Sequence, residues 1–124
     1  MSISKPVGSI LCLGRNRRNQ ALLSQVLAKA GYRVEVALTS QDMLSAIEHR
    51  AIALALIDIS GFDAKIWESC QRLRSRDIPF FVITPSQNAH TPAQYDSNIP
   101  LLVKPLAIRS LLTLIAQTLQ VHHG

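Results

Sequence analysis

Five short apolar segments that alternate with stretches of helical periodicity constrain the fold of this chain more than any other feature of its sequence. The predicted strands cover residues 9–13, 33–37, 53–57, 80–83 and 101–103. The predicted helices cover residues 17–30, a segment from a cap at Thr39 or Ser40 to residue 49, residues 64–75, and residues 106–120. Because parallel strands need long crossover connections, this alternation predicts a doubly wound α/β fold with a five-stranded parallel sheet.

The connection at residues 85–100 departs from this alternation. It contains three prolines and several small polar residues, and it has no sustained apolar stripe. Proline removes a backbone donor and interrupts a helix, so we expect a loop with at most a short helical turn. The fourth helix of the fold is therefore predicted to be shortened or replaced by a loop.

Length and composition indicate one globular domain spanning residues 1–124, with a core from about residue 9 to residue 121. Of the 124 residues, 48 % are hydrophobic and 17 % charged, which is enough to bury a core without disulfides or metals. No apolar run is long enough to span a bilayer, and residues 1–8 lack the apolar core of a secretory leader. Cys12 and Cys70 fall in predicted core elements, as in a reducing compartment. We therefore expect a cytoplasmic protein with no membrane contact.

The net charge of +5 raises the question of a nucleic-acid partner. The arginines form two small clusters, at residues 15–18 and 72–76, with no aromatic side chain between them. Such clusters are typical of a solvated basic surface, and we do not expect a nucleic-acid partner.

Three polar residues end predicted strands at one edge of the sheet, where doubly wound folds carry their sites. Asp58 directly follows the buried segment at 53–57, while Thr84 and Lys104 follow two other strands. A carboxylate, a hydroxyl and an ammonium that converge can take up a phosphoryl group, with the carboxylate as the attacking group. The same residues can equally form an ordinary ion pair beside a capping threonine. The three residues alone leave both interpretations open.

The order and context of these residues resemble the receiver domains of two-component response regulators, the CheY-like family, from about residue 9 to residue 119. The segment AGYRVEVA is similar to the turn that leads into the second strand of that family. The resemblance implies a flavodoxin-like fold, with Asp58 as the phosphoacceptor candidate and Thr84 as the switch residue. It also implies that Lys104 contacts phosphate and that the Lys104–Pro105 peptide bond is cis, which an X-Pro bond tolerates.

The sequence departs from this family where the metal site is expected. Receivers usually carry two adjacent acidic residues after the first strand, but here Gly14 and Arg15 occupy those positions. Asp58 and, by resemblance, the backbone carbonyl of Ser60 make a poor site for an ion that prefers six oxygen ligands. We expect no cofactor, and Mg²⁺ binding that is weak at most. The loop after Asp58 is short, with Phe62 in place of the usual proline, and Leu101 replaces the usual aromatic switch residue.

Arg15 has two possible roles in this site. It can stand beside Asp58 as a fixed cation and take over part of the charge that a metal would supply. Alternatively, it can point to solvent while Lys104 alone pairs with Asp58.

Three functions remain open from the sequence. The first is an atypical receiver that is not an enzyme and that binds a histidine kinase or another signalling protein, with little or no phosphorylation of Asp58. The second is a working phosphoacceptor that a histidine kinase phosphorylates at Asp58, with Arg15 and Lys104 around the phosphoryl group. The third is a flavin- or nucleotide-binding module, because Gly14 leads into a helix N-terminus.

The closing helix carries more apolar residues than one face of a helix requires. Between residues 105 and 121 the single charged residue is Arg109. The apolar residues are Leu106, Ile108, Leu111, Leu112, Leu114, Ile115, Leu119 and Val121. We therefore predict a homodimer or a partner contact through this helix, unless residues 85–100 fold over the surplus.

Overall fold

The computed structural model describes residues 8–84, 101–104 and 106–123 of the chain. Its five strands are β1 (Ser9–Leu13), β2 (Val34–Ala37), β3 (Ile52–Asp58), β4 (Phe80–Thr84) and β5 (Leu101–Val103). They form one sheet in the order β2-β1-β3-β4-β5, and all neighbouring strands are parallel. The predicted five-stranded parallel sheet is confirmed.

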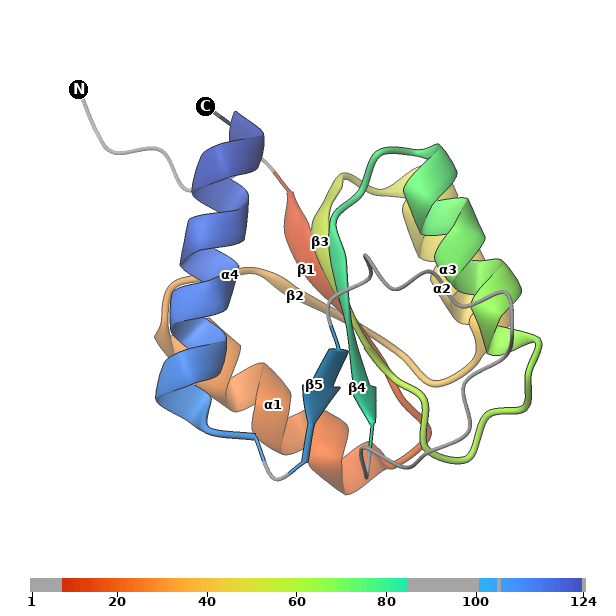
Figure 1. The fold of residues 1–124 in the computed structure, drawn as a ribbon, viewed down its shortest axis with the longest axis horizontal. Coiled ribbons are helices and arrows are strands. Elements are labelled where there is room, and N and C mark those ends of the chain that lie inside the picture. Colours follow the sequence, from red (N-terminus) through yellow and green to blue (C-terminus); the bar gives the residue numbers. More distant parts are fainter. Residues whose placement is uncertain (1–7, 85–100, 105, 124) are drawn as a thin grey trace.

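Four helices cover the sheet in the described part of the chain. They are α1 (Arg17–Lys29), α2 (Ser40–His49), α3 (Ile66–Ser75) and α4 (Ile108–His123). Helices α1 and α4 lie on one face of the sheet, and α2 and α3 lie on the other (Figure 1). No described helix is long and apolar enough to cross a membrane.

The alternation of side chains along the strands divides the core into two clusters. On β1, Ile10 and Cys12 belong to the cluster under α1 and α4, while Leu11 and Leu13 belong to the cluster under α2 and α3. Both faces of β1 are therefore buried, as expected for an inner strand of a parallel sheet. Each fully buried leucine contributes about 1.5–3 kcal/mol to the free energy of unfolding.

Local signals set the ends of two helices. Asn16 caps α1 by accepting a hydrogen bond from the backbone N–H of Asn19 at 3.0 Å. Thr39 caps α2 by accepting one from Asp42 at 3.0 Å, which decides between the two predicted caps. After α1, Gly31 has a φ of 97°, the left-handed conformation that commonly ends a helix.

Several element boundaries differ from the prediction. Strand β3 is longer than residues 53–57, because Asp58 still pairs in register with Ile83 of β4. Helix α3 begins at Ile66 rather than residue 64, after a turn in which Asp63 accepts a hydrogen bond from the N–H of Lys65. Helix α4 begins at Ile108 rather than residue 106.

Two predictions concern residues outside the described part of the chain. One is the shortened fourth helix at residues 85–100, and the other is the cis bond before Pro105.

The apolar surplus of the closing helix is largely covered. Leu111, Ile115 and Leu119 are buried, and Leu106, Leu112 and Leu114 pack partly against the same cluster. Ile108 is 42 % exposed. Since most of the surplus packs on the sheet, a contact of α4 with another chain stays a prediction that the fold does not test.

Candidate functional site

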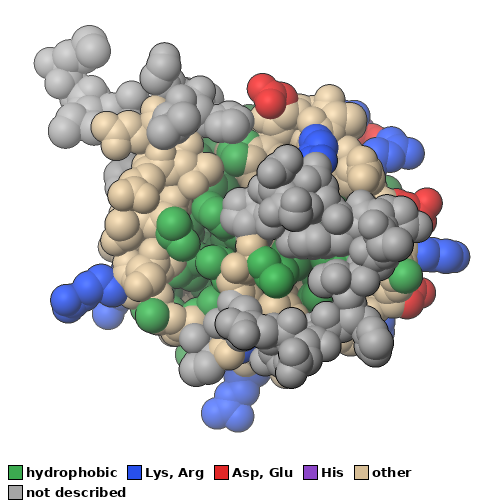
Figure 2. Space-filling model, in the orientation of Figure 1, with side chains coloured by type: hydrophobic (Ala, Val, Ile, Leu, Met, Phe, Trp, Pro, Cys, Tyr) green, Lys and Arg blue, Asp and Glu red, His purple; other side chains and the backbone are tan. Residues whose placement is uncertain are grey.

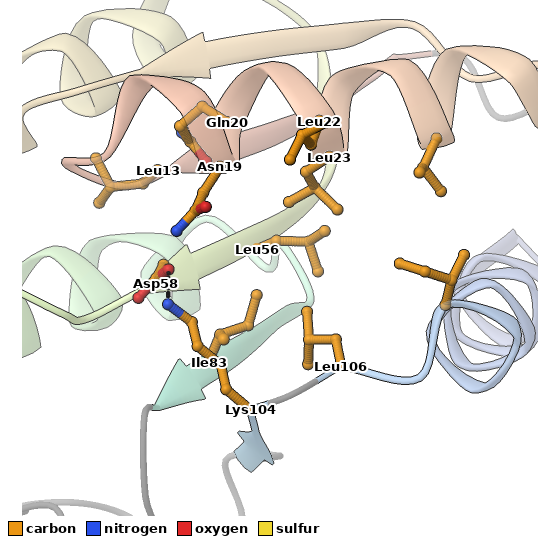
Figure 3. A pocket seen from close by; sticks show the side chains of 12 residues that line it. Leu13, Asn19, Gln20, Leu22, Leu23, Leu56, Asp58, Ile83, Lys104 and Leu106 are labelled. Carbon is orange, nitrogen blue, oxygen red and sulfur yellow. Dashed lines mark ion pairs between the residues drawn. The ribbon is translucent and has the colours of Figure 1, made fainter.

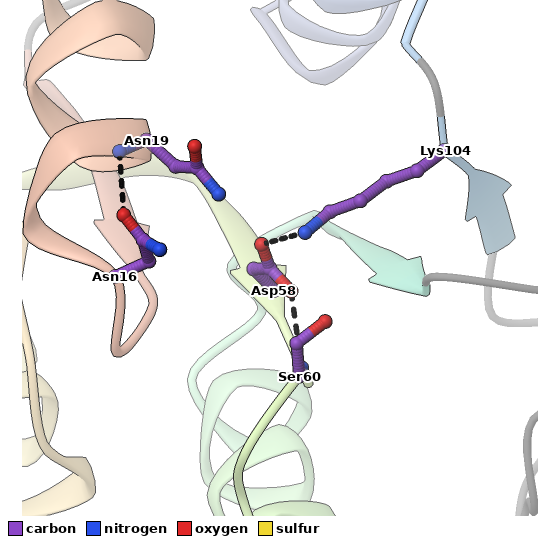
Figure 4. A network of polar contacts seen from close by, with 5 residues as sticks. All are labelled: Asn16, Asn19, Asp58, Ser60 and Lys104. Carbon is purple, nitrogen blue, oxygen red and sulfur yellow. Dashed lines mark hydrogen bonds and ion pairs between the residues drawn. The ribbon is translucent and has the colours of Figure 1, made fainter.

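An ion pair between Asp58 and Lys104 lies at the carboxyl edge of the sheet. Asp58 ends β3 and Lys104 follows β5, and the distance from Nζ to Oδ2 is 2.7 Å. The other carboxylate oxygen, Oδ1, accepts a hydrogen bond from the backbone N–H of Ser60 at 3.0 Å (Figure 4). The exposed fractions are 16 % for the Asp58 side chain and 31 % for that of Lys104, so solvent screens this pair only in part.

Thr84 and Ser60 complete the polar surroundings of Asp58. Thr84 is the last residue of β4 and is buried, and its carbonyl accepts a hydrogen bond from the N–H of Lys104 at 2.9 Å. The Oγ atom of Ser60 is buried and has no hydrogen-bond partner among the residues that the structure describes. A buried hydroxyl without a hydrogen bond lowers the stability of the fold unless a water molecule or a ligand binds to it. Asp58 and Lys104 meet at one edge of the sheet as expected, and Thr84 ends the strand between theirs, while the chemical roles of all three stay predictions.

Gly14 lies between this site and a buried glutamine that the sequence analysis did not single out. A Cβ atom at Gly14 would come within 3.1 Å of Oε1 of Gln20 and 3.4 Å of Cβ of Asp58. Gln20 is 4 % exposed and donates through Nε2 to the carbonyls of Cys12 at 2.7 Å and Ala37 at 3.3 Å. The signal that could have found it is a polar side chain on the inward face of an amphipathic helix.

Arg15 contacts the loop after β3 instead of Asp58. Its Nη1 donates to the carbonyl of Gly61 at 3.2 Å, and its guanidinium lies 5.6 Å from the ring centroid of Phe62. Of the two predicted roles of Arg15, the second agrees with these contacts in that Lys104 pairs with Asp58 and Arg15 does not, while a fixed cation beside Asp58 stays a prediction. Lys104 is the cation that pairs with Asp58, and Arg15 joins the loop after β1 to the loop after β3.

The residues around Asp58 do not fit Mg²⁺. Neither Gly14 nor Arg15 supplies a carboxylate, and both oxygens of Asp58 are already engaged by Lys104 and Ser60. Among residues 8–84, 101–104 and 106–123 no group of three or more His, Cys, Asp or Glu side chains is placed to hold a metal ion. A magnesium ion prefers six oxygen ligands, and Gly14, Arg15 and Asp58 together offer it one carboxylate.

Neither a protein-family model nor a curated protein matches the sequence. Solved structures do match. A CheY-like receiver domain protein from Methanospirillum hungatei superposes with a TM-score of 0.74 at 25 % identity, over 95 % of this chain and 99 % of that one. A CheY-like receiver domain from Methylobacillus flagellatus and the chemotaxis protein CheY4 from Vibrio cholerae each reach 0.74 at 18 % identity, over 90 % of this chain and 98 % of theirs.

The chain has the fold of a response-regulator receiver domain. The match covers nearly the whole chain and nearly all of each neighbour, so the likeness is to a receiver domain as a unit. Within this fold Asp58 ends the central strand, at the edge where doubly wound sheets carry their sites. The resemblance to receiver domains that the strand-end residues suggested is therefore confirmed for the fold.

Proposed function

We propose that this receiver domain is a protein-interaction module of a two-component signalling pathway that works with little or no phosphorylation of Asp58. The observation that carries the proposal is that each carboxylate oxygen of Asp58 already has a partner within the chain, Lys104 at 2.7 Å and the N–H of Ser60 at 3.0 Å. We propose a histidine kinase or another signalling protein as the partner. In this proposal the whole chain, residues 1–124, is one signalling domain and not an enzyme.

The charges around Asp58 support this proposal. Phosphoryl transfer to a carboxylate brings negative charge to negative charge, and a metal ion normally neutralises it. Among the described residues one ammonium, that of Lys104, pairs with Asp58, while the guanidinium of Arg15 donates to the carbonyl of Gly61. A single cation that is already paired gives less electrostatic stabilisation than the transfer requires.

A working phosphoacceptor is the second candidate. In that reaction an oxygen of Asp58 attacks phosphorus, and the phosphorus–nitrogen bond of a phosphohistidine breaks to release the imidazole. The Oγ of Ser60, which has no partner in the described part of the chain, and the ammonium of Lys104 favour this candidate, because both can donate to phosphoryl oxygens.

The nucleotide-binding candidate has weaker support. A phosphate at the start of α1 would need the backbone donors of its first turn, and Asn16 already accepts a hydrogen bond from the N–H of Asn19. The N–H of Asn19 is therefore not free to bind a phosphate unless the side chain of Asn16 moves away.

Incubation with acetyl phosphate tests the leading proposal. The wild-type protein and Asp58→Asn are treated with and without Mg²⁺, and intact mass spectrometry counts phosphoryl adducts. We expect no adduct above the level of Asp58→Asn under either condition, and no change in NMR shifts near Asp58 with a beryllofluoride mimic. A stoichiometric adduct that needs Mg²⁺ and disappears in Asp58→Asn would replace the proposal with an ordinary phosphoacceptor. An adduct that forms without Mg²⁺ would support the second candidate in a metal-free form.

A further inference from the structure

A groove of about 630 Å³ runs from the Asp58–Lys104 ion pair along α1 to the first turn of α4 (Figure 3). Its volume is in the range of small-molecule sites. Apart from the ion pair, two polar residues of α1 line it, Asn19 and Gln20. The apolar lining residues are Leu13, Leu22, Leu23, Val26, Leu56, Ile83, Leu106 and Ile108.

The rims of the groove expose large apolar side chains. Leu22 on α1 is 56 % exposed, and Ile108 on α4 is 42 % exposed. Leu56 and Ile83, which line the groove from the sheet, are fully buried. Hydrophobic side chains are visible at the surface beside α4 (Figure 2). An apolar recess with exposed apolar rims gains free energy when an apolar body covers it.

Hydrogen-bond donors gather where the groove reaches the Asp58–Lys104 ion pair. The ammonium of Lys104 has three N–H groups, and one is directed at Asp58. The side chain of Asn19 points toward Asp58 from α1, on the side opposite Lys104 (Figure 4). Asp58 and Lys104 are the charged residues in the described lining of the groove, and their charges cancel. The donors of Lys104 and Asn19 require a hydrogen-bond acceptor, and the net charge of +5 on the whole chain favours an acceptor with negative charge.

We propose that this groove binds an amphipathic small molecule with one carboxylate head and an alkyl body. The head accepts hydrogen bonds from Lys104 and Asn19, and the body lies over Leu22, Leu23 and Leu106. The carboxylate head and Asp58 then share the ammonium of Lys104, so binding of the ligand weakens the ion pair between Lys104 and Asp58. The proposal does not rest on the proposed function, because it needs only the groove and the donors of Lys104 and Asn19.

Titration with decanoate tests the proposal, using ¹⁵N-labelled protein and NMR. We expect saturable shifts at Asn19, Leu23 and Lys104, with little change on α2 and α3. The uncharged 1-decanol is expected to bind about ten-fold more weakly, since a charge-assisted hydrogen bond is lost. Decyltrimethylammonium is expected not to bind. No saturable shifts with decanoate, equal binding of all three heads, or shifts centred elsewhere would each overturn the proposal.

Two matched variants locate the site. Leu22→Asp places a charge on the exposed rim, and Val36→Asp makes the same change at an apolar residue that is 47 % exposed on β2 and does not line the groove. We expect Leu22→Asp to abolish decanoate binding and Val36→Asp to leave it unchanged. If both variants change decanoate binding to the same extent, decanoate does not bind in this groove and the proposal is overturned. Sedimentation of wild type as a dimer that Leu22→Asp breaks, with no decanoate binding, would instead show that the groove holds a second copy.

Discussion

Gly14 and Gln20 lie so close that a Cβ atom at position 14 would be 3.1 Å from Oε1 of the glutamine. Gln20 cannot turn away freely, because its Nε2 donates to the carbonyls of Cys12 and Ala37. A side chain at position 14 would therefore crowd Gln20. The glycine removes a carboxylate from the site and at the same time leaves room for Gln20.

Replacement of Gly14 by alanine tests this packing. Because the neighbour must move, Gly14→Ala is expected to lower the free energy of unfolding by about 1–2 kcal/mol, measured by urea denaturation. In a Gln20→Ala background the same change is expected to cost clearly less. An equal cost in both backgrounds would show that the two residues are not coupled.

Rebuilding the acidic pair tests the metal site. Wild type is expected to show no Mg²⁺-dependent NMR shifts around Asp58. Gly14→Asp combined with Arg15→Asp adds two carboxylates, and millimolar Mg²⁺ binding is then expected, limited by the crowding at Gln20. Without metal this variant is expected to be less stable, because three carboxylates repel one another.

The matched control is Gly14→Asn with Arg15→Asn, which adds similar volume without charge. Mg²⁺ binding by wild type or by this control would contradict the expected role of the carboxylates.

Removal of the ammonium at Lys104 leaves Asp58 partly buried without its cation. Lys104→Met is expected to lower the free energy of unfolding by about 1–3 kcal/mol, less than for a fully buried pair because both side chains keep some exposure. Adding Asp58→Asn is expected to restore most of the loss. Denaturation curves for the single and double variants measure both effects, and a silent Lys104→Met would mean that the ion pair contributes nothing to stability.

The contacts of Arg15 are expected to stabilise the loop after β3. Arg15→Ala removes the hydrogen bond to Gly61 and the contact with Phe62, so the amides of this loop should exchange with solvent faster. The effect on global stability is expected to be below about 1 kcal/mol, because Arg15 is exposed. Arg17→Ala, at another exposed arginine, is the control, and equal exchange rates in both variants would argue against this stabilisation.

The two cysteines should make stability fall at high pH. Burial raises the pKa of Cys12 and of Cys70 from 9.0 to about 12, with Arg74 slightly opposing the shift at Cys70. Above pH 9 the thiols ionise in the unfolded chain but not in the folded one. Their contribution to stability is therefore complete below pH 9 and is lost as pH rises from there toward 12.

Replacement of both cysteines by alanine is the test of that pH dependence. Thermal denaturation between about pH 8 and pH 10.5 is expected to show a shallower fall for the double variant than for wild type. The native thiols are also expected to react slowly with an aromatic disulfide reagent, since both are buried. Rapid reaction at neutral pH would contradict both expectations.

Local patterns in the sequence were sufficient to predict the sheet and the position of the site. Continuous apolar runs mark buried parallel strands, and parallel strands bring their carboxyl ends to one edge. For that reason Asp58 and Lys104 were predicted to meet although 46 residues separate them, and they do so at 2.7 Å.

Tertiary structure alone decided the direction of Arg15, the role of Gln20 and the groove beside α4. A long side chain at a strand end takes its partner from whichever loop passes nearby, and here that is the carbonyl of Gly61 rather than the carboxylate of Asp58. Gln20 is needed because two carbonyls from different strands face the same helix turn. The groove depends on how α1 and α4 are spaced over the sheet, which follows from the packing of many side chains together and from no local pattern.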